Sequence, residues 1–196
     1  AVKIAVDMVK EKLISKKEAV LRIDPNSLDT LLHPTLDEKS SINIIANGLP
    51  ASPGAACGKV VFSSDEAERL NSMMQDTILV RVETSPEDIH GMHAAKGILT
   101  SRGGMTSHAA VIARGMGIPC VSGSSEIDIN YEAKTFKTSS VEVKEGDIIT
   151  IDGSSGRIIS GEVPTVKPEI SGDFSKLMSW ADGFRKLKVR ANSETP

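Results

Sequence analysis

The stretch from Gly97 to Gly115 constrains the fold of this chain more than any other part of the sequence. Its first residues, around Ile98 and Leu99, form a short apolar run that predicts a strand. The pair Gly103–Gly104 follows and allows a sharp backbone turn with φ values that other residues disfavour. Small and apolar residues then predict a helix. We therefore expect a strand, a tight turn and a helix in immediate succession.

His108 stands in the first turn of this predicted helix. The hydroxyl of Thr106 or Ser107 can cap the helix by accepting a hydrogen bond from a free backbone N–H group. The imidazole then lies where such N–H groups and the positive end of the helix dipole meet, which favours an anion such as phosphate. A neutral imidazole is also a nucleophile near neutral pH, since its reference pKa is about 6.5. His108 is therefore either a phosphoryl acceptor in covalent catalysis or a helix-capping residue without chemistry, and spacing alone leaves both open.

The residues around His108 have alternative roles of the same kind. Arg102 either pairs with a phosphoryl group or solvates the turn. Gly103–Gly104 either lets the backbone approach phosphate or forms a plain turn. Ser107 donates a hydrogen bond to a phosphoryl oxygen or orients the imidazole. Arg114 lies six residues after His108, about 600° around a helix of 3.6 residues per turn, so we expect an ion pair or a docking contact there.

No metal or disulfide site is expected from the sequence. His90 and His93 have the i, i+3 spacing of a helix, but no carboxylate or cysteine stands near them as a partner, which favours a solvated helix face. Cys57 and Cys120 form no CxxC pair, so neither a disulfide framework nor a zinc site is indicated. Cys120 is expected to be a small core residue.

Composition excludes several classes of partner. The formal net charge is −3, which indicates neither a nucleic-acid nor an anionic-membrane partner. With four Phe, one Tyr and one Trp, the chain cannot stack bases or sugars over a wide surface. No apolar run approaches the roughly 18 residues of a membrane span, and the N-terminus lacks the pattern of a secretory signal. We expect a cytoplasmic location.

Apolar periodicity and cap residues predict the other elements. Ser15 and Glu18 have the form of a capping box, and Ser85 followed by Pro86 begins a further helix. Helices are expected over residues 1–13, 15–21, 24–33, 64–74, 85–95 and 173–187. Strands are expected over residues 43–46, 58–62, 77–82, 117–123 and 141–144, and a hairpin joins 148–151 to 157–159.

The order of these elements predicts an α/β fold. Strands alternate with helices first and antiparallel strands follow, which is typical of a compact β/β/α unit. Residues 48–54, rich in Pro and Gly, are expected to form a turn. The polar residues 35–41 and the proline-containing residues 164–172 are expected to be linkers.

The sequence GGMTSHAAVIARG at residues 103–115 resembles, without a gap, the phosphohistidine signature of the pyruvate, phosphate dikinase family, a branch of the PEP-utilising enzymes. Two related branches, phosphoenolpyruvate synthase and enzyme I of the sugar phosphotransferase system, usually carry Arg where this chain has Met105. The resemblance implies a swivelling β/β/α phosphohistidine domain with helical flanking segments. It also implies that His108 is phosphorylated in turn by a nucleotide-derived phosphoryl group and by phosphoenolpyruvate.

The resemblance also implies a domain division. Residues 1–41 would be the helical tail of an upstream nucleotide-binding domain plus a linker. Residues 42–162 would be the swivelling domain. Residues 163–196 would be a linker and a helix leading to an absent C-terminal barrel that binds phosphoenolpyruvate and pyruvate.

The implied reaction interconverts ATP, phosphate and pyruvate with AMP, pyrophosphate and phosphoenolpyruvate. Mg²⁺ would be bound at the partner sites outside this chain, which alone would not turn over. The full-length enzyme would be a homodimer through the barrel, and the fragment itself a monomer. In plant members of the family the threonine that matches Thr106 is a target of regulatory phosphorylation, where a dianion beside the nucleophile repels the donor. Two alternatives stay open, the same domain of phosphoenolpyruvate synthase and a free-standing phosphocarrier module.

Overall fold

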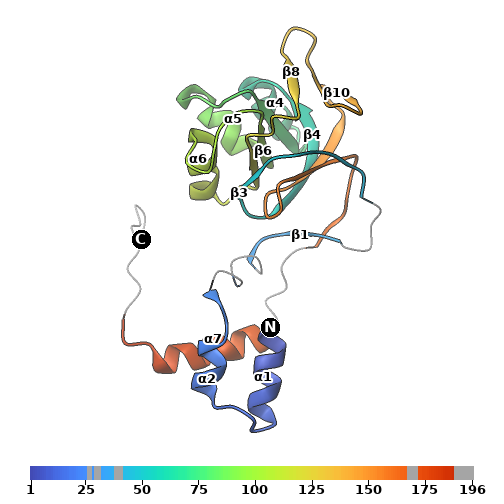
Figure 1. Ribbon diagram of the computed structural model, residues 1–196. Helices are drawn as coiled ribbons and strands as arrows, with labels where there is room; N and C mark the ends of the chain where they lie inside the picture. Colours follow the sequence, from blue (N-terminus) through green and yellow to red (C-terminus); the bar gives the residue numbers. More distant parts are fainter. Residues whose placement is uncertain (26–27, 29–31, 38–41, 167–171, 188–196) are drawn as a thin grey trace. The chain divides into compact units, whose positions relative to one another are not determined.

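The computed structural model describes residues 1–25, 28, 32–37, 42–166 and 172–187 (Figure 1). The chain divides into two compact units. One comprises residues 32–168, and the other comprises residues 1–31 together with 169–196. The larger unit combines a mixed sheet with helices, so the expected α/β class is confirmed.

The main sheet of the larger unit has eight strands in the order β2-β12-β11-β4-β5-β6-β7-β3. The neighbours β4, β5, β6 and β7 run parallel to one another, and the other pairs are antiparallel. The strands are β2 (Ile44–Asn47), β3 (Leu49–Ser52), β4 (Ala55–Val61), β5 (Thr77–Arg81), β6 (Gly97–Thr100), β7 (Cys120–Ser122), β11 (Ile148–Asp152) and β12 (Arg157–Ser160). The predicted hairpin of β11 and β12 is confirmed.

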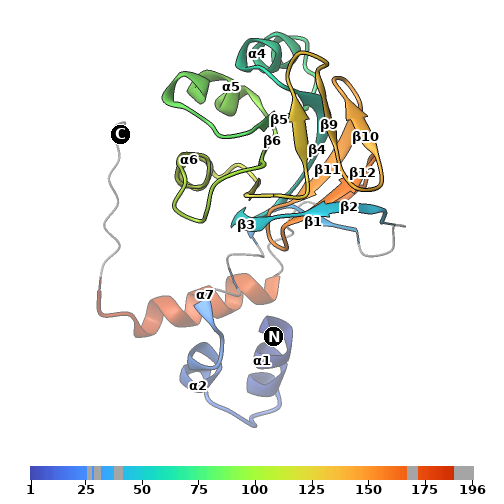
Figure 2. The same ribbon diagram turned by 45° about the horizontal axis from the view of Figure 1, so that its top comes forward.

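The first two strands of this sheet lie at its two opposite edges. β2 pairs with β12 and β3 pairs with β7, although only Gly48 separates β2 from β3. The chain therefore passes directly from one edge to the other, which requires a strongly curled sheet (Figure 2). A Cβ on Gly156 would lie 2.1 Å from the Gly48 carbonyl oxygen, so only glycine fits at that closure. The expectation of a turn over 48–54 is wrong, because residues 49–52 find a partner strand in β7.

Helices cover one face of the sheet and a smaller sheet covers the other (Figure 2). The helical face carries α4 (Ser64–Ser72), the 3₁₀ turn η2 (Pro86–Asp88), α5 (Ile89–Ala94) and α6 (His108–Met116). The smaller sheet contains β8 (Asp128–Asn130), β9 (Thr135–Lys137) and β10 (Glu142–Lys144) in antiparallel pairs. The sequence did not predict β8 or β9. Phe136 of β9 is fully buried in the core cluster of that face.

Short strands occupy the two predicted linkers. β1 (Thr35–Leu36) pairs antiparallel with β13 (Thr165–Val166), and Asp37 donates a backbone hydrogen bond of 3.0 Å to the Pro164 carbonyl. The other linker residues, 38–41 and 167–171, lie outside the described part of the chain. The first and last strands of the larger unit, β1 and β13, therefore lie side by side where the chain enters and leaves this unit.

The elements of the smaller unit with described bounds are α1 (Val2–Lys10), α2 (Lys16–Leu21) and α7 (Gly172–Phe184). The predicted capping box at Ser15 is confirmed, and Ala19 and Leu177 are buried where these helices meet. Leu13 was expected on the apolar stripe but is 63% exposed, because α1 ends three residues earlier. The predicted helix over 24–33 lies largely outside the described residues. Helices from both ends of the chain thus form one unit, and the division at residues 1–41, 42–162 and 163–196 stays a prediction.

Candidate functional site

The expected strand, turn and helix are present around His108. β6 ends at Thr100 and α6 begins at His108 itself. Ser107 is the N-cap, and its Oγ accepts a hydrogen bond of 3.3 Å from the backbone N–H of Ala110. The alternative cap, Thr106, is wrong: this residue is exposed, and within the described residues its hydroxyl has no hydrogen-bond partner. The structure thus places His108 in the first turn of a helix.

The two nitrogens of the His108 ring have different surroundings. Nδ1 lies 3.1 Å from Oγ1 of Thr84, whereas Nε2 makes no hydrogen bond to any residue in the described ranges. The residue is half-buried, so part of the ring stays accessible to solvent. Which nitrogen carries the proton is set by the partner of the other. A Thr84 hydroxyl that accepts from Nδ1–H leaves the lone pair on Nε2.

Thr84 is a site residue that the sequence did not reveal. It follows β5, and His108 follows β6, the parallel neighbour of β5. Loops that follow neighbouring parallel strands meet at the same edge of a sheet, where ligands commonly bind. A search among the residues that follow the predicted strands would have included Thr84.

A chain of hydroxyl groups holds the start of α6 against the sheet. Thr100 at the end of β6 donates a hydrogen bond of 3.1 Å to Oγ of Ser122 in β7. Oγ of Ser107 lies 3.3 Å from that same Ser122 hydroxyl. Thr100 and Ser122 are fully buried, so their mutual bonds compensate for the loss of water. A bond from Ser107 to a phosphoryl oxygen stays a prediction.

The two glycines of the turn differ in their backbone requirements. Gly103 has φ of +112°, and a Cβ there would lie 2.9 Å from Cβ of Ser107. Gly104 has no positive φ, and a Cβ there would meet no atom within 4 Å. The expectation of a glycine-only backbone is therefore confirmed for Gly103 and wrong for Gly104, because the sharp bend falls on one residue.

Two arginines flank the turn. Arg102 has an exposed side chain, and its backbone N–H donates a hydrogen bond of 2.9 Å to the Val82 carbonyl. Its pairing with a phosphoryl group stays a prediction. Nη2 of Arg114 donates a bond of 2.6 Å to the Met105 carbonyl, and among the described residues it has no acidic partner. Of its two expected roles, the ion pair is therefore wrong for the described residues, since Arg114 ties the helix to the turn before it, and the docking contact stays a prediction.

One acid–base pair lies beside the site. Arg81, at the end of β5, lies 3.4 Å from a carboxylate oxygen of Asp88. Burial acts to raise the pKa of Asp88, but hydrogen bonds from Ser85 and Ser64 and the charge of Arg81 outweigh it and hold that pKa below its ordinary value. Asp88 is thus a carboxylate that organises the loop carrying Thr84.

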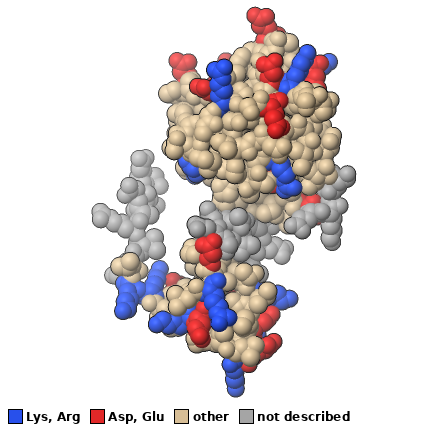
Figure 3. All heavy atoms as spheres, in the orientation of Figure 1, with Lys and Arg blue, Asp and Glu red and all other residues tan. Residues whose placement is uncertain are grey.

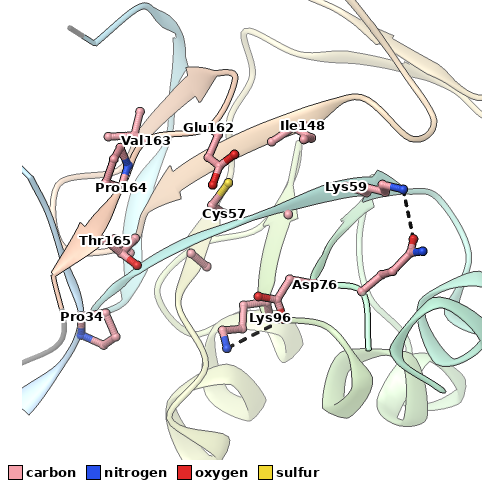
Figure 4. A pocket seen from close by; sticks show the side chains of 14 residues that line it. Pro34, Cys57, Lys59, Asp76, Lys96, Ile148, Glu162, Val163, Pro164 and Thr165 are labelled. Atoms are coloured by element: carbon pink, nitrogen blue, oxygen red, sulfur yellow. Dashed lines mark hydrogen bonds and ion pairs between the residues drawn. The ribbon is translucent and has the colours of Figure 1, made fainter. Parts of the chain in front are cut away.

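A cavity of about 610 Å³ lies at the opposite end of the strands (Figure 4). Asp76 and Lys96 on its wall stand just before β5 and β6, whereas Thr84 and His108 follow these strands. Cys57 also lines the cavity, and burial raises the pKa of its thiol. The cavity is therefore separate from His108.

The remaining sequence expectations concern metals, cysteines and surface charge. In the described ranges, no group of three or more His, Cys, Asp or Glu residues is placed to hold a metal ion. Cys57 and Cys120 are free thiols. Cys120 is fully buried among apolar residues, which confirms it as a core residue, and this burial raises its pKa to about 12. Figure 3 shows acidic and basic side chains interspersed on the visible face of each unit. No helix of the described part is both long and apolar enough to cross a membrane.

Comparison with known proteins places the site in a family. The PEP-utilising enzyme mobile domain matches residues 73–156, a range that contains both Thr84 and His108. Over its whole length the chain is 63% identical to a pyruvate, phosphate dikinase of Rhizobium meliloti. Residues 73–156 belong to the PEP-utilising enzymes. The chain carries their mobile domain, the swivelling phosphohistidine domain, as the signature around His108 predicts.

Other relatives agree with this assignment. The chain is 56% identical over its whole length to a pyruvate, phosphate dikinase of Clostridium symbiosum. It spans only 22% and 23% of the length of these two dikinases, respectively. Among solved structures, aconitase X of Thermococcus kodakaraensis aligns with 60% of this chain and 98% of its own. The TM-score of 0.37 and identity of 18% are too low to support an argument.

Proposed function

We propose that this chain is the phosphoryl-carrier domain of a pyruvate, phosphate dikinase and that His108 is the residue phosphorylated. The observation that carries the proposal is the asymmetry of the ring: Thr84 engages Nδ1, while Nε2 is left without a hydrogen bond to any described residue. A half-buried imidazole at a helix start, with one nitrogen fixed and the other accessible, is suited to nucleophilic attack on phosphorus.

The transfer from phosphoenolpyruvate involves one bond made and one broken. The lone pair of Nε2 attacks phosphorus, and the bond from phosphorus to the enol oxygen breaks. The electron pair of that bond leaves with the enolate, which takes up a proton to become pyruvate. The proton on Nδ1 stays in place, bonded to Thr84. The positive end of the α6 dipole favours the added negative charge, and the exposed Arg102 is available to pair with it.

The rest of the reaction belongs to other parts of a longer protein. A dikinase interconverts ATP, phosphate and pyruvate with AMP, pyrophosphate and phosphoenolpyruvate, and the relatives named as dikinases are more than four times as long as this chain. Mg²⁺ neutralises charge in phosphoryl transfer. We assign it to those parts, because the described residues include no cluster suited to a metal. A homodimer of the complete enzyme and a cytoplasmic location are part of the same proposal.

Labelling of the complete enzyme tests the site. The enzyme is incubated with phosphoenolpyruvate and Mg²⁺, and acid-labile, base-stable phosphate is mapped to a peptide. We expect label on the peptide that contains His108 and none in the His108→Ala variant. Label that persists in this variant, or that maps to another peptide, contradicts the assignment.

Product analysis separates the dikinase from phosphoenolpyruvate synthase. The dikinase consumes inorganic phosphate and releases pyrophosphate, whereas the synthase uses water. The similarity to proteins named as dikinases favours the first. We expect pyrophosphate among the products of the complete enzyme, and phosphate alone would identify the synthase.

A further inference from the structure

The segment between β5 and η2 is held in place from two sides. The hydroxyl of Tyr131, just after β8, accepts a hydrogen bond of 2.7 Å from the backbone N–H of Val82. The Val82 carbonyl accepts a bond of 2.9 Å from the backbone N–H of Arg102 in the loop that leads to α6. The hairpin of the small sheet and the loop before the helix therefore hold the two peptide groups on either side of the same residue, Val82.

The ring of Tyr131 is itself well supported. The guanidinium carbon of Arg81 lies 5.2 Å from the ring centroid, and the Phe62 ring packs edge-on at 6.5 Å. Nη1 of Arg81 donates a bond of 3.1 Å to the Phe62 carbonyl. The hairpin that carries Tyr131 is anchored by the fully buried Phe136. The hydroxyl thus projects from a fixed position onto the backbone of Val82.

Thr84 lies between this anchor and a second one. Two residues before it, Val82 is bonded to Tyr131, and directly after it the backbone N–H of Ser85 donates a bond of 2.9 Å to Asp88. Thr84 contacts Nδ1 of His108 across 3.1 Å. A shift of the segment by a fraction of an ångström would weaken that contact, because hydrogen bonds depend steeply on distance and angle.

We propose that Tyr131 is a positioning residue for phosphoryl transfer at His108, acting through Val82 and Thr84. Tyr131 touches no reacting atom. Its hydroxyl holds the segment in which Thr84 accepts from Nδ1–H, so that the lone pair stays on Nε2. The expected effect of Tyr131 on the transfer rate rests on the proposed function of His108. Its effect on the orientation and protonation of the His108 ring does not.

The first test compares Tyr131→Phe with Lys134→Gln. The Phe variant removes the hydroxyl but keeps the ring over Arg81. Lys134 lies in the same hairpin, and the Gln variant breaks its ion pair with Glu145, which follows β10, without touching Val82. Nitrogen-15 shifts of His108 report which ring nitrogen is protonated. We expect Tyr131→Phe alone to move these shifts toward the values of free histidine. Unchanged shifts in Tyr131→Phe, or an equal change in Lys134→Gln, would overturn the proposal.

The second test is a double-mutant cycle with Thr84→Val. The rate of His108 phosphorylation is measured with phosphoramidate, a small donor that needs no other domain. We expect Tyr131→Phe to slow it about five-fold, as for the loss of one hydrogen bond, and to add nothing in the Thr84→Val background. Additive effects would overturn the proposal. If the proposed function is wrong, phosphoenolpyruvate will not label His108. The nitrogen-15 shifts of the His108 ring do not depend on that result, so they still test the role of Tyr131.

Discussion

At His108, one ring nitrogen is committed to a protein hydrogen bond and the other is not. Nδ1 lies 3.1 Å from Thr84, and no described residue bonds Nε2. Such a contact fixes the ring orientation, and with Thr84 as the acceptor it leaves the lone pair on Nε2. Phosphoryl transfer depends strongly on positioning, so the hydroxyl of Thr84 is expected to affect the rate although it never touches phosphorus.

Replacement of Thr84 tests this role at the scale of one side chain. Thr84→Val keeps the shape of the side chain but removes the hydroxyl, so we expect phosphorylation of His108 by phosphoenolpyruvate in the complete enzyme to slow about ten-fold. Thr84→Ser keeps the hydroxyl and serves as the matched control, with most of the rate retained. Equal rates for the two variants would show that the contact has no part in the transfer.

A charge at Thr106 tests the regulatory expectation. Thr106 is exposed two residues before His108, and within the described residues its hydroxyl is unbonded. We expect Thr106→Asp to slow phosphorylation of His108 about ten-fold at low salt, because the carboxylate repels an anionic donor, and salt should reduce the effect. Thr106→Val should leave the rate nearly unchanged. A Thr106→Asp enzyme as fast as the Val variant would contradict electrostatic control at this position.

The sequence indicated some of these residues and not others. Ser107 and His108 stand in a local pattern of turn and helix start that a reader of the sequence can recognise. The partners of Thr84 and Tyr131 lie 24 and 49 residues away in the chain, so no local pattern marks them. The pairing of β5 with β6 brings Thr84 to His108, and the packing of the small sheet brings Tyr131 to Val82, so these contacts depend on the tertiary fold.

Among the elements, the turn between β6 and α6 has the strictest backbone requirement. We expect Gly103→Ala to destabilise the protein by about 2 kcal/mol, because φ of +112° disfavours any Cβ and Ser107 already occupies the space. Gly104→Ala is the matched control and should change the free energy of unfolding by less than about 0.5 kcal/mol. Denaturant unfolding of both variants measures the difference. Equal losses would show that the turn does not depend on Gly103.

The loop between β5 and α5 should show a pH-dependent stability. The pKa of Asp88 is held below its ordinary value in the folded state, so its contribution is present above the unfolded pKa of about 3.9 and is lost as the pH falls through the lower folded pKa. We expect Asp88→Asn to cost about 1–3 kcal/mol at pH 7, through the weakened bonds to Ser85 and Arg81. Near pH 3 the cost should shrink. A cost that is constant between pH 7 and pH 3 would contradict the assignment.

Elements with local signals were predicted from the sequence, and elements that depend on distant partners were not. The hairpin of β11 and β12 has a short Gly-containing turn between apolar runs, and α2 has a capping box. β3 contains a proline and pairs with β7, about seventy positions further along the chain, where no alternation marks it. β8 and β9 are three residues each, too short for periodicity to reveal.

For the whole molecule, the proposed carrier function requires a compact unit whose two connections do not hold it at two separate places. The pairing of β1 with β13 brings these connections together, so they leave the unit at one place. The curled sheet positions His108 and Thr84 after neighbouring parallel strands, while the cavity of Figure 4 lies before those strands. Under the proposed function, this unit would present Nε2 of His108 to sites elsewhere in a longer protein.

The most direct measurement of the central claim is the identity of the atom that carries phosphate. The complete enzyme, labelled with nitrogen-15 histidine, is phosphorylated by phosphoenolpyruvate, and the phosphorus–nitrogen bond is located by NMR. We predict one phosphohistidine, bonded through Nε2 of His108, with Nδ1 still protonated. Phosphate on Nδ1, or on any other residue, would contradict the account.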